Sequence, residues 1–151
     1  METVVRSIKE LDIFAANTLA ALFVQSQNNP SDKATMLGLS GDLGAGKTAF
    51  VQALARALFI EEQVTSPTFV IARFYPLPNN ETFTRLVHMD AYRIEDASEL
   101  PPIGWEEIVA DPRNLVVVEW PEKIASQFPS HAHNFFFEVV DETTRKISTR
   151  E

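Results

Sequence analysis

The spacing of apolar residues along the chain predicts both helices and strands. Apolar side chains recur with a period of about 3.6 residues from Leu11 to Phe23 and again within 47–59, which predicts two amphipathic helices. Ser7 and Glu10 have the spacing of a capping box at the start of the first helix. The runs 34–40 and 115–119 are almost continuously apolar, as is typical of strands buried on both faces of a parallel sheet.

Shorter apolar segments predict further strands around these elements. We expect strands at 3–7, 69–77, 82–89, 134–140 and 145–149. Segments 69–77 and 82–89 predict a hairpin that turns at 78–80. Segments 134–140 and 145–149 predict another that turns at 141–142. Helical segments are expected near 96–100 and 105–110. The pattern predicts one α/β domain over residues 1–151, with a partly parallel sheet and antiparallel additions.

Composition and charge narrow the classes of function. The 151 residues carry 13 basic and 21 acidic side chains, a net charge of −8. Nonspecific binding to nucleic acid needs a basic surface, so we expect any RNA to be held by another subunit. The absence of cysteine excludes disulfides and thiolate chemistry. No signal peptide or membrane-spanning run is recognisable, so a cytoplasmic protein with no membrane partner is expected.

Four of the five glycines fall within nine residues, 38–46, and three of them belong to a recognisable motif. The segment GDLGAGKT (41–48) matches G-x-x-x-x-G-K-[ST] and lies between a predicted buried strand and a predicted helix. In such a loop the backbone amides and the start of the helix bind phosphate. Lys47 would reach the β- and γ-phosphates, and the Thr48 hydroxyl would ligate Mg²⁺. A glycine-rich turn that binds nothing is the alternative.

We therefore predict an ATP site with Mg²⁺ in a P-loop NTPase three-layer sandwich. The residues assigned to nucleotide binding comprise the loop, the start of its helix and one strand end: Asp42, Leu43, Gly44, Ala45, Gly46, Lys47, Thr48, Ala49 and Asp90. The adenine is expected to contact the N-terminal segment near residues 7–10.

Two acidic residues end predicted strands where a P-loop protein needs an acid near Mg²⁺. Asp90 and Glu119 both terminate apolar segments, and ligands in α/β sheets bind outside the carboxyl ends of strands. One acid would hold the metal and the other would orient the attacking water or act as a base, so both are predicted to be catalytic together with Lys47. A strand-end acid can also merely cap the next turn. Trp120 is expected on the opposite face, as core or partner surface, and His88 as a hydrogen-bonded buried histidine.

These motifs together resemble the TsaE (YjeE) family of small bacterial P-loop ATPases. The resemblance is carried in order by GDLGAGKT (41–48), SPTF (66–69), H-x-D-x-Y-R (88–93) and EW (119–120), over roughly residues 5–125. It implies an ATPase needed for threonylcarbamoyl (t6A) modification of tRNA, working with TsaB and TsaD subunits and contacting tRNA only through that complex.

The resemblance also implies roles for single residues. Thr48 and Glu119 would be the Mg²⁺ ligands, and Asp90 would assist the γ-phosphate or the water. The resemblance adds Thr68 to the nucleotide-binding residues and places Thr68 and Trp120 on a nucleotide-sensing surface. On pattern alone a simple proline turn is favoured at Thr68. Ala49 departs from the polar residue common in the family.

Other P-loop functions remain as alternatives. A small-molecule or nucleoside kinase would use the same loop and metal, but few residues remain for a lid with several arginines. A GTPase is disfavoured because the guanine-selecting string N-K-x-D is absent. The last alternative is a scaffold that binds nucleotide without hydrolysing it.

Overall fold

A computed structural model describes residues 1–65 and 71–150. Its centre is a seven-stranded sheet with the strand order β1-β7-β6-β2-β5-β4-β3. The strands are β1 (Glu2–Val5), β2 (Thr35–Gly41), β3 (Ala72–Pro76), β4 (Arg85–Asp90), β5 (Asn114–Glu119), β6 (His133–Val139) and β7 (Arg145–Arg150).

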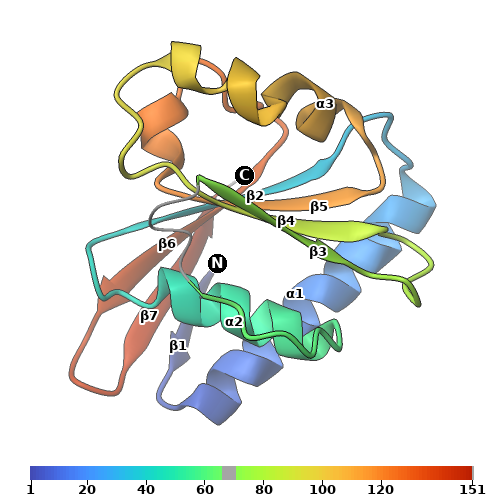
Figure 1. Cartoon of the computed structure of the whole chain (residues 1–151). Helices are drawn as coiled ribbons and strands as arrows, with labels where there is room; N and C mark the ends of the chain where they lie inside the picture. Colours follow the sequence, from blue (N-terminus) through green and yellow to red (C-terminus); the bar gives the residue numbers. More distant parts are fainter. Residues whose placement is uncertain (66–70, 151) are drawn as a thin grey trace.

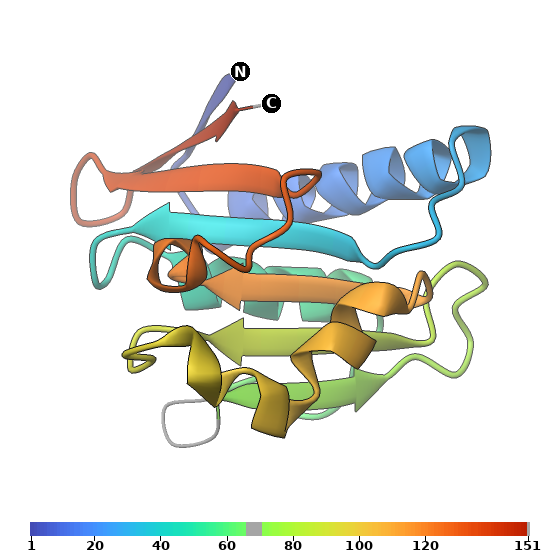
Figure 2. The same ribbon diagram turned by 90° about the horizontal axis from the view of Figure 1, so that it is seen from above.

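The sheet combines a parallel centre with antiparallel edges. Strands β6, β2, β5 and β4 are parallel neighbours, while β3, β7 and β1 pair antiparallel (Figure 2). Both predicted hairpins, β3–β4 and β6–β7, are confirmed. The start of the predicted strand 69–77, at residues 69–70, and the SPTF segment (66–69) lie outside the described residues.

Helices cover both faces of the sheet and make three layers (Figure 1). The long helices α1 (Ile8–Asn28) and α2 (Lys47–Ala57) lie on one face. The opposite face carries α3 (Trp105–Ala110) and the short 3₁₀ turns η1 (Ala97–Glu99), η2 (Pro101–Ile103) and η3 (Pro121–Ile124). The mixed α/β sandwich predicted from the sequence is therefore confirmed.

Alternation along the central strands divides the core into two clusters. Leu37, Leu39 and Val117 belong to the cluster beneath α1 and α2. Met36 and Val118 belong to the cluster beneath α3 and the 3₁₀ turns. Burial on both faces explains why 34–40 and 115–119 are almost continuously apolar.

The predicted capping box forms only in part. The Ser7 hydroxyl accepts from the Glu10 amide at 3.1 Å, as the motif requires. The Glu10 carboxylate, however, accepts from the Arg6 amide at 3.2 Å. The cap still fixes the N-terminus of α1 beside the loop that joins β2 to α2.

Candidate functional site

The loop between β2 and α2 needs glycine because of its backbone path. Gly41, Gly44 and Gly46 have φ values of 145°, 79° and 106°. At Gly41 space is also short, since a Cβ there would lie 2.5 Å from the carbonyl oxygen of Phe137 on β6. The motif residues thus let the chain turn sharply beside the neighbouring strand and enter α2 at Lys47.

The Lys47 side chain lies folded over the loop. Its ammonium donates to the backbone carbonyl of Gly41 and to that of Asp42 at 3.0 Å, and it lies 4.1 Å from the centre of the Trp120 ring. Burial lowers the pKa of Lys47 below its ordinary value, and nearby carboxylates, Glu119 first, oppose that shift. The two carbonyl oxygens thus hold the ammonium beside the loop, and the oxygens of an anionic ligand could replace them as acceptors.

Thr48 joins the loop to the end of β5. Its hydroxyl lies 2.9 Å from Oε1 and 3.1 Å from Oε2 of Glu119, to which it donates. Glu119 is only 3% exposed, although it ends a strand. The sequence places these residues far apart, and the parallel pairing of β2 with β5 brings them together.

Glu119 has a second partner on the neighbouring strand. Nε2 of His88 lies 2.6 Å from Oε2 of Glu119, and His88 is fully buried. Nδ1 of His88 is also buried and has no hydrogen-bond partner among the described residues. The expectation of a buried, hydrogen-bonded histidine is therefore confirmed, but its partner is the site residue Glu119, and its Nδ1 adds no second hydrogen bond within the part of the chain that the structure describes.

Asp90 lies beside Glu119 in the sheet, because the two are register partners of β4 and β5. Its Oδ1 accepts from the amide of Tyr92 at 2.9 Å, so it also shapes the turn that follows β4. Both strand-end acids thus reach the same edge of the sheet, as predicted.

A cavity of about 270 Å³ collects most of these groups. It is lined by the loop, the start of α2 and the strand ends: Leu43, Gly44, Gly46, Lys47, Thr48, Ala49, Asp90, Glu119 and Trp120. Of the other predicted loop residues, Ala45 is buried and Asp42 supplies a carbonyl to Lys47. The cavity therefore brings together most of the residues predicted to bind nucleotide; Asp42 and Ala45 do not line it, and Thr68 lies outside the described residues.

A second cavity of about 430 Å³ adjoins the other side of the loop. It shares Gly46 and Ala49 with the first cavity. The rest of its lining comes from Ala45 of the loop, from the N-terminal segment and the start of α1, including Ser7, and from the β6–β7 hairpin, including Arg145. The segment predicted to contact adenine therefore lies beside the loop.

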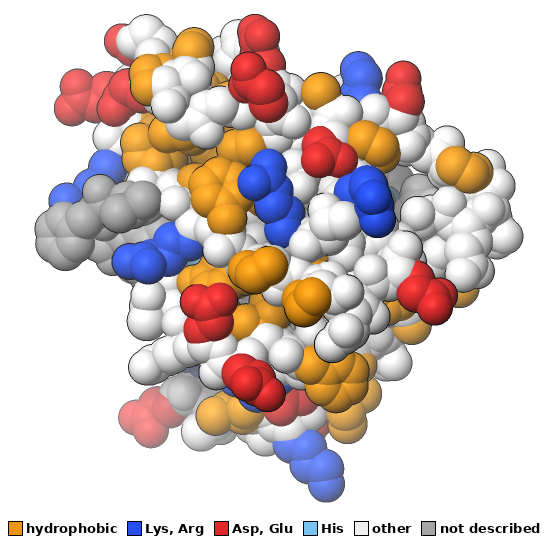
Figure 3. Space-filling view, turned by 45° about the vertical axis from the view of Figure 1, so that its right-hand side comes forward, with side chains coloured by type: hydrophobic (Ala, Val, Ile, Leu, Met, Phe, Trp, Pro, Cys, Tyr) orange, Lys and Arg blue, Asp and Glu red, His pale blue; other side chains and the backbone are white. Residues whose placement is uncertain are grey.

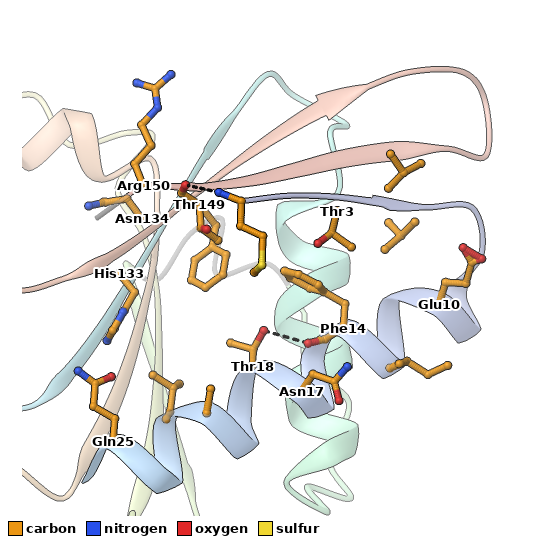
Figure 4. Close-up of a pocket in the computed structure, with 17 residues that line it drawn as sticks. Thr3, Glu10, Phe14, Asn17, Thr18, Gln25, His133, Asn134, Thr149 and Arg150 are labelled. Atoms are coloured by element: carbon orange, nitrogen blue, oxygen red, sulfur yellow. Dashed lines mark hydrogen bonds between the residues drawn. The ribbon is translucent and has the colours of Figure 1, made fainter. Parts of the chain in front are cut away.

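A larger cavity, of about 630 Å³, lies elsewhere, between α1 and the strands β1, β6 and β7 (Figure 4). Its lining is mainly apolar, with polar groups such as Asn17 and Thr18 on α1. The Thr18 hydroxyl donates within its own helix, to the Phe14 carbonyl at 2.9 Å. Size alone would favour this cavity, but the loop and the strand-end acids line the smaller one.

Comparison with known proteins identifies the family. The profile of "Threonylcarbamoyl adenosine biosynthesis protein TsaE" matches residues 11–147. The chain belongs to the TsaE family.

Relatives and a solved structure agree with this membership. The Bacillus subtilis tRNA threonylcarbamoyladenosine biosynthesis protein TsaE is 34% identical over 143 residues, 95% of this chain and 82% of the relative. The Treponema pallidum protein of the same name is 34% identical over 117 residues, 78% of this chain and 82% of the relative. The crystal structure of Bacillus subtilis YdiB superposes with a TM-score of 0.72 at 26% identity, covering 99% of this chain and 83% of that one.

TsaE family proteins are involved in tRNA threonylcarbamoyladenosine biosynthesis. On the face shown in Figure 3, acidic side chains lie among the basic ones and no continuous basic area is seen. In the described residues no helix is long and apolar enough to span a bilayer.

The Trp120 side chain contacts both the core cluster on the α3 face and the loop cavity. It packs partly against the cluster on the α3 face, as alternation predicts. However, β5 ends at Glu119, and Trp120 has a φ of 62°. Its ring therefore also lines the loop cavity, contacts the Lys47 ammonium and packs on Tyr92 with centroids 5.0 Å apart. Sequence reasoning from the residues alone missed this contact.

Proposed function

We propose that this chain is the Mg²⁺-dependent ATPase subunit that supports t6A modification of tRNA together with TsaB- and TsaD-type subunits. The observation that carries the proposal is the contact of the Thr48 hydroxyl with the Glu119 carboxylate at 2.9 Å, beside the Lys47 ammonium and the glycine loop. A P-loop NTPase needs these groups together at one end of its sheet.

The loop and Lys47 would bind the triphosphate. The first amides of α2 have no helical acceptor and lie at the positive end of the helix dipole, which favours an anion. Phosphate oxygens would replace the carbonyls of Gly41 and Asp42 as acceptors for the Lys47 ammonium. A charge-assisted hydrogen bond to phosphate is stronger than one to a neutral carbonyl, so the exchange favours binding.

Thr48 and Glu119 would hold Mg²⁺. Their hydroxyl and carboxylate oxygens are the hard ligands that this ion prefers, and they are already adjacent. Within residues 1–65 and 71–150 no three acidic or histidine side chains form a metal site by themselves. The donor set therefore fits an ion whose remaining ligands are water and phosphate. When bound, Mg²⁺ would offset negative charge on the β- and γ-phosphates.

Asp90 would orient the attacking water and accept its proton. It lines the same cavity as Lys47 and Thr48, and it is the register partner of Glu119. A positioned carboxylate of this kind typically contributes a factor of about 10² to 10⁴ to a rate.

The adjoining cavity of about 430 Å³ would receive the adenine and ribose. It continues from Gly46 and Ala49 toward Ser7 and Ile8, so a nucleotide with its phosphates in the loop could extend into it.

The net negative charge of the chain supports a complex in which the partner subunits bind the tRNA and this chain binds ATP. A net charge of −8 disfavours direct contact with tRNA, so the partner complex would hold the RNA in the cytoplasm. ATP turnover by this chain would then serve repeated cycles of its partners.

The test is ATP turnover by the purified chain with and without the TsaB- and TsaD-type proteins. We expect slow Mg²⁺-dependent release of phosphate alone and faster release with both partners. The Lys47→Ala variant is the negative control. No Mg²⁺-dependent hydrolysis in either condition would contradict the proposal, and a phosphorylated nucleoside or metabolite from a substrate panel would favour a kinase.

A further inference from the structure

We propose that His88 is a positioning residue for the metal ligand Glu119, an inference that rests on the proposed function. Its Nε2 lies 2.6 Å from Oε2 of Glu119, and both side chains are buried. His88 and Glu119 come from neighbouring parallel strands, β4 and β5, so the sheet itself sets their separation.

The contact determines which imidazole nitrogen carries the proton. An ionised carboxylate only accepts hydrogen bonds, and a neutral imidazole has a single N–H group. Since Nε2 faces the carboxylate, we infer that Nε2 carries a proton and donates it to Oε2, while the buried Nδ1 has no hydrogen-bond partner within residues 1–65 and 71–150. A buried N–H on Nδ1 would leave a donor unsatisfied and would leave Nε2 with nothing to donate.

This hydrogen bond orients the Glu119 carboxylate. His88 occupies Oε2 from the side of the sheet, while the Thr48 hydroxyl approaches Oε1 most closely, at 2.9 Å. The hydrogen bond from His88 to Oε2 restricts rotation of the Glu119 carboxylate. Oε1 therefore stays directed at the loop, where the metal would bind. Partners that hydrogen-bond to a metal ligand typically affect metal affinity or activity about 10- to 100-fold.

Among the described residues Nδ1 of His88 has no hydrogen-bond partner, and this argues against a purely space-filling role. A leucine or methionine would fill a similar volume without burying an unpaired polar atom, which lowers stability. The histidine is therefore explained by what Nε2 does for Glu119.

The first test compares two amide variants that differ in reach. His88→Gln places an N–H group near the position of Nε2, while His88→Asn is too short to contact Glu119. The readout is the Mg²⁺ concentration that half-saturates binding of a non-hydrolysable ATP analogue, measured by calorimetry, with thermal unfolding as a check on folding. His131→Gln is the matched control, because His131 bonds the Ala34 carbonyl, away from the loop.

We expect His88→Asn to raise the half-saturating Mg²⁺ concentration about 10- to 100-fold, and His88→Gln to restore it to within about threefold of wild type. In a Glu119→Ala background, His88→Asn should cause no further change, because the ligand that it orients is gone. Wild-type Mg²⁺ dependence in both variants would overturn the inference. An equal loss of Mg²⁺ affinity in His88→Asn and His88→Gln that persists in the Glu119→Ala background would also overturn it.

A spectroscopic signature tests the same contact without any ligand. Nitrogen-15 NMR of the three histidines should show that Nε2 of His88 carries a proton, and this signal should change in Glu119→Ala. A Nδ1–H tautomer would refute the inference even if His88→Asn fails to fold. If wild type binds no nucleotide with Mg²⁺, the proposed function itself fails; if it binds and the variants do not differ, only the role of His88 is wrong.

Discussion

Replacing Gly41 by alanine should destabilise the chain much more than replacing Gly44. Both glycines have positive φ, at 145° and 79°, so alanine at either position is strained by about 1 to 2 kcal/mol. Only at Gly41 does the new Cβ meet the backbone, 2.5 Å from the Phe137 carbonyl oxygen, whereas nothing lies within 4 Å at Gly44. Overpacking of this kind adds about 1 to 3 kcal/mol.

Gly41→Ala should therefore cost about 2 to 5 kcal/mol and Gly44→Ala about 1 to 2 kcal/mol. Urea unfolding followed by circular dichroism measures both, provided that the slopes agree with wild type. The difference arises because β2 must move away from β6 to admit a methyl group. Equal stabilities of the two variants would refute the close approach of these strands.

Four further outcomes are expected. Lys47→Ala should lower ATP affinity by about 100-fold or more, and unchanged binding by calorimetry would contradict the assignment of the loop. Because burial lowers the pKa of Lys47, its ammonium should lose its proton at a lower pH than an ordinary lysine does. As pH rises, ATP affinity should therefore fall at that lower pH, and Lys47→Arg should not show this fall. Glu119→Ala should bind ATP yet hydrolyse it about 100-fold more slowly with partners present; full activity would remove Glu119 from the mechanism. Thr68→Ala should abolish the difference between ATP and ADP in partner binding, whereas an unaltered difference would leave Thr68 as a turn residue.

The sequence predicts the parts of the site that depend on local pattern. Positive φ at Gly41 and Gly46, and the helix that begins at Lys47, follow from a short motif with strong conformational preferences. The strand ends at Asp90 and Glu119 were predictable because apolar runs stop there. Parallel strands then bring both acids to one edge of the sheet.

Contacts that depend on register were not predictable from one sequence. His88 meets Glu119 because β4 and β5 pair with Asp90 beside Glu119, which places the histidine diagonally across from the carboxylate. The available signal was that His88 and Asp90 share a face of their strand, two residues apart. Trp120 required knowledge of a left-handed backbone that ends β5, and nothing in its residue type indicates this.

The hydrogen bond from Thr48 to Glu119 joins positions 71 apart in the sequence. Pairing between such distant parallel segments is a slow step in folding, so the pocket can form only once the middle of the sheet has assembled. A nucleotide bound there would stabilise the folded state but have no site in the unfolded chain. At a free concentration one hundred times its dissociation constant, it would add about 2.7 kcal/mol to the free energy of unfolding. The melting temperature of this small protein would then vary with the supply of its ligand.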